Sequence, residues 1–316
     1  MQYRNLGRTG LKLGAVSLGG WLTYGNTVDA ASTSAVVRRA LECGVNHFDT
    51  ADVYAQGECE SALGRALEGV RRSSIVLASK VFWPTGQGPN DQGLSRKHIH
   101  ESVAASLKRL KTDYLDIYYC HRFDPDVPID DVIRSMEDLI TQGKILYWGV
   151  SCWSSGQIRD AIRLAKFHRP VVDQPPYNVF DRNVEKDVLM TCAKEGVGVV
   201  VWSPLAQGVL TGKYLDGRPP GSRGASEKVN KFMERYLRPE ATATVKAFVA
   251  LARQAGLTPA QLALGWCLRR PEVTSAIVGA TSVAQIEETA AAGPLPKEIL
   301  PHLERLAREA PLIDAI

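Results

Sequence analysis

Four residues with chemically useful side chains lie far apart in the chain, and each one ends or closely follows an apolar run that is typical of a β-strand. They are Asp49, Tyr54, Lys80 and His121. If these strands are parallel neighbours, their carboxyl ends meet at one face, where the catalytic groups of a closed parallel barrel collect. The four side chains can then form one site.

A tyrosine, a lysine, a carboxylate and a histidine can together protonate an oxygen while another group attacks the adjoining carbon. A phenol with an ordinary pKa near ~10 is a poor acid at neutral pH. An ammonium beside it favours the phenolate, so Lys80 is expected to lower the pKa of Tyr54. Asp49 would hold the ammonium, and His121 would orient a carbonyl oxygen. The set predicts reduction of a carbonyl by hydride.

Each of the four residues also has a structural alternative. A tyrosine in a loop is most often part of the surface, and a lysine at a strand end usually reaches solvent. An aspartate there is often a cap, and a single histidine is usually a packed structural residue. Taken one at a time, the structural roles are favoured. The catalytic prediction depends on the elements that bring all four to one face.

Short runs rich in apolar and β-branched residues recur along the chain, separated by helical patterns. Strands that alternate with helices predict βαβ units and a parallel sheet. Eight such runs fit a closed barrel better than an open sheet, so the sequence predicts one (β/α)8 domain over residues 1–316. The predicted strands are Ala15–Leu18, Val45–Asp49, Ser74–Lys80, Tyr114–Cys120, Leu146–Ser151, Val171–Gln174, Gly198–Ser203 and Ser275–Gly279.

The predicted helices rest on caps and on apolar residues spaced three to four apart. Asp29 is a candidate N-cap, and Ser155 is another. The last helix lies beyond the eighth unit and is an addition to the barrel. The helices are Asp29–Cys43, Ser95–Leu110, Ile129–Gln142, Ser155–Phe167, Asn183–Lys194, Val245–Ala255, Pro259–Leu268, Ser282–Ala292 and Lys297–Glu309.

Two further segments stand outside this alternation. Tyr3–Leu6 and Leu11–Leu13 flank a glycine turn and predict an N-terminal β-hairpin. Leu215–Pro239 is rich in Gly, Pro, Ser and charge, and a loop of this length inside a compact domain is usually functional or mobile.

Composition excludes several classes of function. The net charge of the 316 residues is +4, and the basic clusters are short and scattered, so we expect no nucleic acid partner. No stretch approaches the ~20 apolar residues of a membrane helix, and the N-terminus lacks the apolar core of a secretory signal. The six cysteines form no CxxC and no Cys/His ligand spacing, which predicts a reduced, cytoplasmic protein without a structural metal.

The common nucleotide motifs are missing. No GxGxxG follows a predicted strand, so the fingerprint of the doubly wound dinucleotide fold is absent. Gly208–Lys213 is one residue short of a phosphate-binding loop. A nucleotide would therefore have to bind by other means.

The residues around the four candidates resemble the aldo-keto reductases, which are (β/α)8 barrels that reduce aldehydes and ketones with NADPH. The resemblance covers nearly the whole chain. Within the family, the chain is most similar to the branch that holds the β subunits of voltage-gated potassium channels and their bacterial relatives. The matching segments are Tyr3–Gly7, Phe48–Tyr54, Gly93–Ile99, Tyr147–Gly149, Trp153–Ser155, Trp202–Ala206 and Gly212–Tyr214, together with Lys80 and His121.

The resemblance implies a role for each of the four residues. Tyr54 is the general acid, Lys80 tunes it, Asp49 pairs with Lys80, and His121 positions the carbonyl. The channel subunits resemble this chain but carry Asn at the position of His121. Histidine there restores the set of ordinary reductases, which favours an enzyme over a dedicated channel partner.

The resemblance also implies that NADP(H) binds in an extended form across the strand ends. The indole of Trp202 would stack on the nicotinamide, and Ser151 with Gln174 would bind its carboxamide. Many reductases of the family carry Arg where this chain has Gln285, but the channel branch shares this absence, so NADP is favoured over NAD. The implied cofactor residues are Trp21, Asp49, Ser151, Gln174, Trp202, Ser203, Pro204, Leu205, Ala206, Gln207, Lys213, Arg223, Gly279, Thr281, Gln285 and Glu288.

Four aromatic residues at or after strand ends are candidates for the substrate wall. They are Trp21, Tyr24, Trp83 and Trp153. An apolar wall suits a small aldehyde or ketone, although Tyr24 and Trp153 could equally cap the barrel.

Two other functions remain open. A redox-sensing accessory subunit would bind NADP(H) tightly, turn over slowly and form a homo-oligomer. A lyase or isomerase would use Lys80 as a Schiff base, and the neighbouring Tyr54 argues against this.

Overall fold

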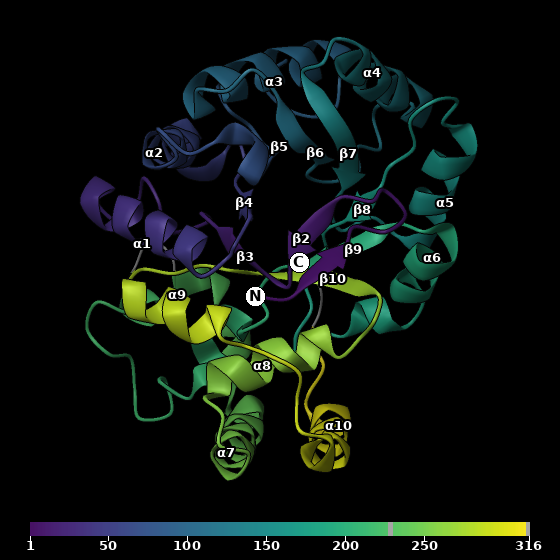
Figure 1. Ribbon diagram of the computed structural model, residues 1–316. Helices are drawn as coiled ribbons and strands as arrows, with labels where there is room; N and C mark the ends of the chain where they lie inside the picture. The colour runs from purple at the N-terminus through teal and green to yellow at the C-terminus, as the bar shows by residue number, and fades with distance from the viewer. Residues whose placement is uncertain (227–229, 314–316) are drawn as a thin grey trace.

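Eight parallel strands close into a barrel in the computed structural model, which describes residues 1–226 and 230–313 (Figure 1). The order around the barrel is β10-β3-β4-β5-β6-β7-β8-β9, so neighbours along the chain are neighbours in space. The predicted (β/α)8 barrel with an N-terminal hairpin is confirmed. The strands are β3 Val16–Gly19, β4 His47–Asp49, β5 Val76–Val81, β6 Leu115–Cys120, β7 Ile145–Val150, β8 Val172–Asp173, β9 Gly198–Val201 and β10 Val273–Val278.

Helices form a ring around the strands in Figure 1. Caps set several of their starts: the Asp29 carboxylate accepts from the N–H of Ser32, and Ser154 and Thr258 each form a reciprocal capping box. The helices are α1 Ala30–Glu42, α2 Glu58–Ala66, α3 Arg96–Leu110, α4 Ile129–Thr141, α5 Ser155–Leu164, α6 Val188–Glu195, α7 Pro239–Gln254, α8 Pro259–Leu268, α9 Val283–Ala290 and α10 Leu300–Glu309.

The N-terminal hairpin covers one end of the barrel. Its strands β1 (Tyr3–Asn5) and β2 (Lys12–Gly14) pair antiparallel. Leu6 and Leu13 are fully buried and join an apolar cluster with inward residues of the barrel strands, including Ile117. The amino-terminal end is therefore filled with apolar side chains, and the carboxyl end is left for polar groups.

The alternation of side chains along each strand decides which polar groups point into the barrel. On β5, Val76 and Ala78 belong to the interior cluster, and Lys80 follows two residues later on the same face. On β4, His47 and Asp49 share a face in the same way, and both are buried. Lys80 and Asp49 thus lie above the apolar filling at the carboxyl end.

Gly149 shows how tightly this interior is packed. It is the register partner of Tyr119, and a methyl group on Gly149 would lie 2.4 Å from Val172 Cγ1 and 2.7 Å from Val172 O. The Gly149→Ala variant is expected to lose about 1–3 kcal/mol of unfolding free energy because backbone cannot move aside. Urea denaturation measures this loss.

A matched control for Gly149 is available in α5. A methyl group on Gly156 would meet only Ser154 Oγ, at 3.9 Å, so Gly156→Ala is expected to leave stability unchanged or raise it by up to about 1 kcal/mol. Equal stability of Gly149→Ala and the wild type would contradict the packing argument.

The structure differs from the predicted elements in several places. Helix α2 was not predicted, because its N-cap is Gly57 in the left-handed conformation and no side chain marks the start. Helix α7 begins at Pro239, six residues before the predicted Val245, since proline suits the first turn. The predicted helix Asn183–Lys194 is divided into a 3₁₀ turn and α6.

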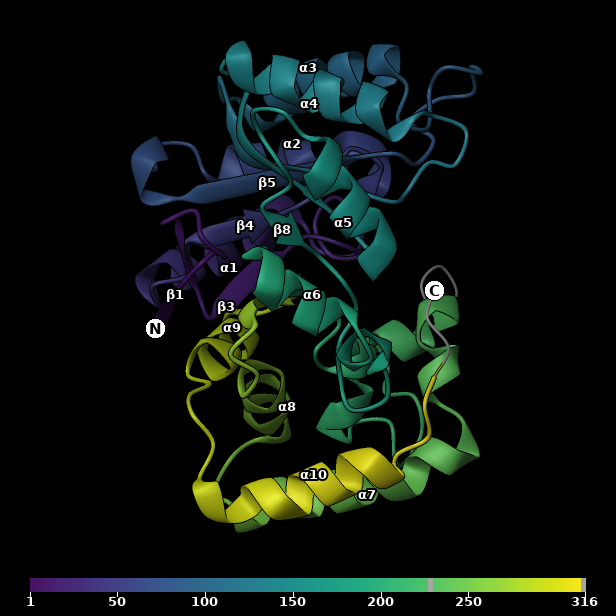
Figure 2. The ribbon, with the colours of Figure 1, turned by 90° about the vertical axis from the view of Figure 1, so that its right-hand side faces the viewer.

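Two helices lie outside the ring. Helices α7 and α10 pack against each other at the periphery, below α8 in both views (Figures 1 and 2). The predicted long loop before α7 contains 3₁₀ turns at Arg223–Ala225, Asn230–Phe232 and Glu234–Tyr236. In residues 1–226 and 230–313, no helix has the length and apolar character needed to cross a membrane.

Candidate active site

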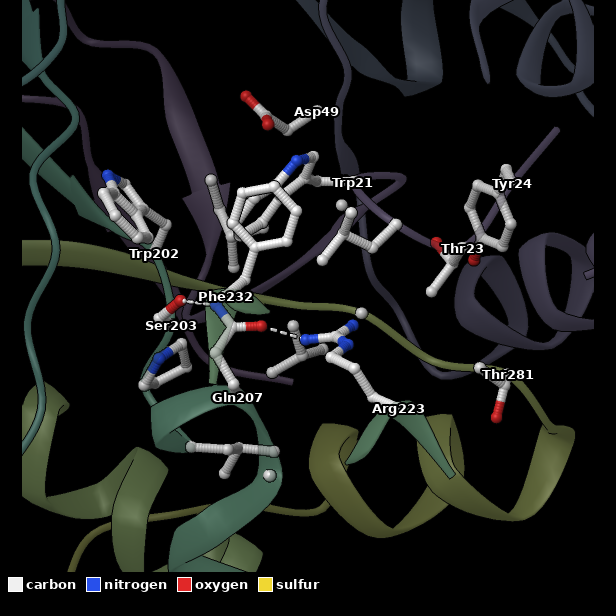
Figure 3. A pocket seen from close by; sticks show the side chains of 18 of the residues that line it. Trp21, Thr23, Tyr24, Asp49, Trp202, Ser203, Gln207, Arg223, Phe232 and Thr281 are labelled. Atoms are coloured by element: carbon white, nitrogen blue, oxygen red, sulfur yellow. Dashed lines mark hydrogen bonds between the residues drawn. The ribbon is translucent and has the colours of Figure 1, made fainter. Parts of the chain in front are cut away.

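A cavity of about 950 Å³ opens at the carboxyl ends of the barrel strands. Residues that end or follow strands line it, among them Asp49, His121, Gln174 and Trp202. Its size falls in the range of cavities that hold cofactors and small molecules. Figure 3 shows its labelled side chains, with Trp202 on one side and Thr281 on the other.

A buried ion pair lies at the floor of this cavity. Lys80 Nζ is 2.6 Å from Asp49 Oδ2 and also donates to Thr50 O at 2.7 Å. Lys80 is fully buried, and Gln174 Nε2 donates to the other Asp49 oxygen at 2.8 Å. Burial alone would lower the pKa of Lys80, but the charge of Asp49 and the contact with Tyr54 raise it above its ordinary value. Lys80 therefore stays charged.

Tyr54 lies within reach of this ammonium. Its hydroxyl is 3.4 Å from Lys80 Nζ, and the next two residues, Ala55 and Gln56, both have a positive φ. Left-handed backbone at two successive non-glycine residues is strained and is found where a functional group is held in place. The short turn Tyr54–Gly57 thus fixes the direction of the phenol.

The expected effect of Lys80 on Tyr54 is only partly correct. Lys80 does act to lower the pKa of Tyr54, but burial has the larger effect and raises the pKa to about 12. The prediction of a net lowering is wrong for this reason. The phenol remains protonated at neutral pH, which is the form that can donate.

His121 lies beside Tyr54 and is buried. Their rings are 5.7 Å apart and nearly perpendicular. Burial, followed by the positive charges of Lys80 and Arg122, holds the pKa of His121 well below its ordinary value. A neutral imidazole carries one N–H, which it can donate to a carbonyl oxygen.

The loop after β9 forms the wall below Trp202 in Figure 3. Ser203, Ala206 and Gln207 all have a positive φ, and Gly208 continues the pattern at +91°. The Gln207 side chain donates to Ser203 Oγ and accepts from Arg223 (Figure 3). Strained backbone at a cavity edge is typical of a ligand clamp.

Two cationic side chains along this wall could pair with the phosphates of a dinucleotide. Lys213 and Arg223 line the cavity, and neither forms an ion pair within the described parts of the chain. Burial lowers the pKa of Arg223, because removal from water disfavours the charged form of the guanidinium. Beyond them, Gly279 and the N-terminus of α9 line the same cavity, an arrangement suited to phosphate. The residues present fit an extended, anionic cofactor.

Aromatic rings cover the central part of the cavity. Trp21 contacts Trp202 at 6.2 Å and Phe232 at 5.0 Å, both edge-on, and it lies 6.4 Å from Tyr54. The ring of Trp83 lies 6.4 Å from the ring of His121. These rings form an apolar surface next to Tyr54 and His121.

Most residues predicted from the sequence line this one cavity. Lys80 lies beneath it and reaches it through Tyr54. The predicted residues that line it are Trp21, Tyr24, Asp49, Tyr54, Trp83, His121, Ser151, Gln174, Trp202, Ser203, Pro204, Leu205, Gln207, Lys213, Arg223, Gly279, Thr281, Gln285 and Glu288.

Two predicted residues lie outside the cavity. Trp153 is buried against Phe123, with ring centroids 5.1 Å apart, because the chain turns at Cys152 with a φ of 59°. Ala206 is fully buried, and its N–H donates to Ser203 O. Trp153 therefore does not line the cavity where the substrate wall was predicted, and the cofactor role of Ala206 stays a prediction.

The structure refines the assignment of two other predicted residues. Tyr24 lines the cavity but lies on the side opposite Trp202 in Figure 3, beside Thr23. It is therefore remote from the nicotinamide stacking position predicted at Trp202. Gln285 accepts from the N–H of Thr281 at 2.8 Å, so its carbonyl caps the start of α9.

Several residues that line the cavity were not predicted from the sequence, and Arg122 and Phe232 are two of them. Arg122 follows His121 directly, and its place at a strand end was a signal that could have been used. Phe232 belongs to the long irregular segment, and no spacing marked it as a residue that would reach Trp21. Within residues 1–226 and 230–313, no group of His, Cys, Asp and Glu is arranged to hold a metal ion.

The fold and this site define a barrel oxidoreductase, and comparison with known proteins agrees. The Aldo/keto reductase family model matches residues 11–308, and the chain belongs to this family. Two relatives are each named a probable voltage-gated potassium channel subunit beta, one from Arabidopsis thaliana and one from Oryza sativa subsp. japonica. Each is 45% identical over 295 residues, which cover 91% of this chain and 90% of the relative.

Membership of the family assigns a general activity. Aldo/keto reductases are oxidoreductases that act on carbonyl substrates and generally bind NAD(P)H. The resemblance to the branch of channel β subunits, inferred from the sequence, is confirmed by the names of these relatives.

Proposed function

We propose that this protein reduces aldehydes or ketones to alcohols with NADPH, and that Tyr54 is the general acid. One observation carries the proposal: a fully buried Lys80 contacts Asp49 and also reaches the Tyr54 hydroxyl, beside a neutral His121. A structural ion pair alone would not need a tyrosine and a histidine facing the same cavity.

The residues divide the proton chemistry among them. The Tyr54 hydroxyl and the single N–H of His121 donate to the carbonyl oxygen of the substrate. As negative charge develops on that oxygen, the Tyr54 proton moves to it and completes the alcohol. The phenolate left behind is stabilised by Lys80, whose charge Asp49 and Gln174 hold in place.

Residues that line the cavity are suited to the nicotinamide and phosphate parts of the cofactor. Trp202 would hold the nicotinamide, Ser151 and Gln174 its carboxamide, and Lys213 with Arg223 the phosphates. When bound there, NADPH supplies the hydride that the carbonyl carbon accepts. The aromatic cover from Trp21 and Phe232 would exclude water from the reacting atoms.

A panel of aldehydes and ketones, followed by loss of NADPH absorbance, tests the proposal. Reduction of at least one class at a rate proportional to enzyme concentration is expected. If the protein binds NADPH but reduces no member of a broad panel, the proposed function is wrong.

The cofactor is expected to be NADPH rather than NADH. NADPH carries more negative charge than NADH, and Lys213 and Arg223 have no carboxylate partner in the part of the chain that the structure describes, so the net positive charge along this wall favours the more anionic cofactor. We expect NADPH to bind at least about tenfold more tightly, since one charge-assisted contact contributes about 1.5 kcal/mol or more. Quenching of tryptophan fluorescence gives both dissociation constants, and equal values would contradict the prediction.

The names of the relatives support a second candidate, a channel-associated subunit that senses the NADP(H) state. That function predicts a homo-oligomer, slow turnover, and co-purification with a membrane protein. Rapid turnover by a protein that sediments as a monomer would exclude it.

A further inference from the structure

Arg122 places a positive charge in the part of the cavity beside His121, where the substrate carbonyl is proposed to bind. It follows His121 directly after β6, is half-buried, and lines the cavity. Its guanidinium lies over the ring of Trp83, 5.6 Å from the centroid. The sequence analysis assigned it no role, and the proposed proton chemistry does not use it.

The hydrogen bonds of Arg122 involve only one of its nitrogens. Nη1 donates to the carbonyl of His121 at 2.6 Å and to Ser151 Oγ at 3.5 Å. Nε and Nη2 have no hydrogen-bond partner among residues 1–226 and 230–313. These two nitrogens form the edge of a guanidinium that binds a carboxylate through two parallel hydrogen bonds. The arginine is therefore anchored at one corner, and its binding edge is available.

The positive charge of Arg122 has no paired carboxylate among residues 1–226 and 230–313. It forms no ion pair within the described residues. Asp173 is fully buried, and burial raises the pKa of that carboxyl to about 8 although the charge of Arg122 acts to lower it. Burial thus disfavours the charged form of Asp173, so this carboxyl is a poor counter-ion for Arg122. Lys80, the other cation near His121, is already paired with Asp49.

We propose that Arg122 binds a carboxylate on the substrate, so that the preferred substrates are aldehydes or ketones that carry a carboxylate group. This inference rests on the proposed function and names the substrate class of the same site. The carbonyl of such a substrate contacts Tyr54 and His121, and its carboxylate contacts Nε and Nη2 of Arg122. Trp83 packs against the hydrocarbon between them.

Paired substrates that differ only in charge test the proposal. We would measure kcat/KM for 3- and 4-carboxybenzaldehyde and for the corresponding neutral formylbenzamides, which have nearly the same shape. For whichever carboxybenzaldehyde isomer is the better substrate, kcat/KM is expected to be about 10- to 100-fold higher than for the matching amide. The reason is that hydrogen bonds to a charged group contribute about 1.5–3 kcal/mol. In Arg122→Gln the ratio of acid to amide is expected to fall to near one, mainly through a higher KM for the acid.

A conservative variant and a remote variant complete the set. Arg122→Lys keeps the charge but loses the two parallel N–H donors of the guanidinium. Its acid-to-amide ratio of kcat/KM is therefore expected to lie between those of the wild type and Arg122→Gln. Arg163 is 70% exposed at the end of α5 and pairs with Asp160, so Arg163→Gln should keep the wild-type ratio. A ratio near one in the wild type, or a full ratio in Arg122→Gln, would overturn the proposal.

Binding in the absence of turnover separates this inference from the proposed function. Titration calorimetry with the same acids and amides in the presence of NADP⁺ reports affinity when no hydride is present. Tighter binding of the acid, lost in Arg122→Gln, supports the carboxylate site even if no aldehyde is reduced. Reduction of the panel without any preference for acids would leave the proposed function intact and reject the role of Arg122.

Discussion

Replacing Tyr54 with phenylalanine is expected to lower kcat for carbonyl reduction about 100- to 10,000-fold, the usual contribution of a general acid. The change removes only the hydroxyl that lies 3.4 Å from Lys80 Nζ. The ring contacts with Trp21 and His121 remain, and Lys80 keeps Asp49 and Thr50 as partners. The stability of the protein and its affinity for NADPH should therefore change little.

Three measurements check this expectation together: single-turnover rates, NADPH affinity and urea denaturation. A matched control is Tyr3→Phe, which removes a phenol that donates to Gly44 O at 2.8 Å in the N-terminal hairpin, far from the cavity. Its rate should equal that of the wild type. Retention of more than about a tenth of the wild-type rate by Tyr54→Phe would show that another group supplies the proton.

The Asp49→Asn variant is expected to lose about 3–5 kcal/mol of unfolding free energy, because it leaves the fully buried ammonium of Lys80 without its carboxylate. Turnover should fall as well, since Lys80 can no longer stay charged beneath Tyr54. The double variant Asp49→Asn with Lys80→Met should be more stable than Asp49→Asn alone, because no unpaired charge remains.

The pH dependence of the Asp49→Asn variant gives a second check. Without Asp49, burial lowers the pKa of Lys80 in the folded state, whereas the unfolded chain keeps the ordinary value. The unfolded state then binds more protons, so the stability of the variant should rise with pH relative to the wild type. The exposed pair Arg163–Asp160 provides the control, and Asp160→Asn should change stability by less than about 1 kcal/mol at any pH. A loss in Asp49→Asn no larger than in that control would contradict the role of the pair.

The fold was predictable because its signals are local and repeated. Each barrel strand is a short apolar run, and caps such as Asp29 mark the helix starts. Helix α2 shows the limit of such signals, since Gly57 caps it through backbone conformation alone. Pro239 is a signal for the start of α7, but the charged residues around it led to the prediction of a longer loop.

The residues of the candidate site were less predictable than the fold. Asp49, Tyr54, Lys80 and His121 were found because a strand end is visible in the sequence and parallel strands share one face. Trp153 was misplaced because the turn at Cys152 directs its ring towards Phe123. Phe232 was missed because a single aromatic residue in an irregular segment carries no positional signal.

By itself, the sequence determined the order of strands and helices and the face on which the four residues would meet, because periodicity and strand ends are properties of neighbouring residues. The tertiary structure decided the rest. Burial raises the pKa of Tyr54 against the pull of Lys80, and distant segments leave Arg122 without a neutralising partner among the described residues. Burial and charge pairing depend on contacts between residues far apart in the chain, so local patterns cannot report them.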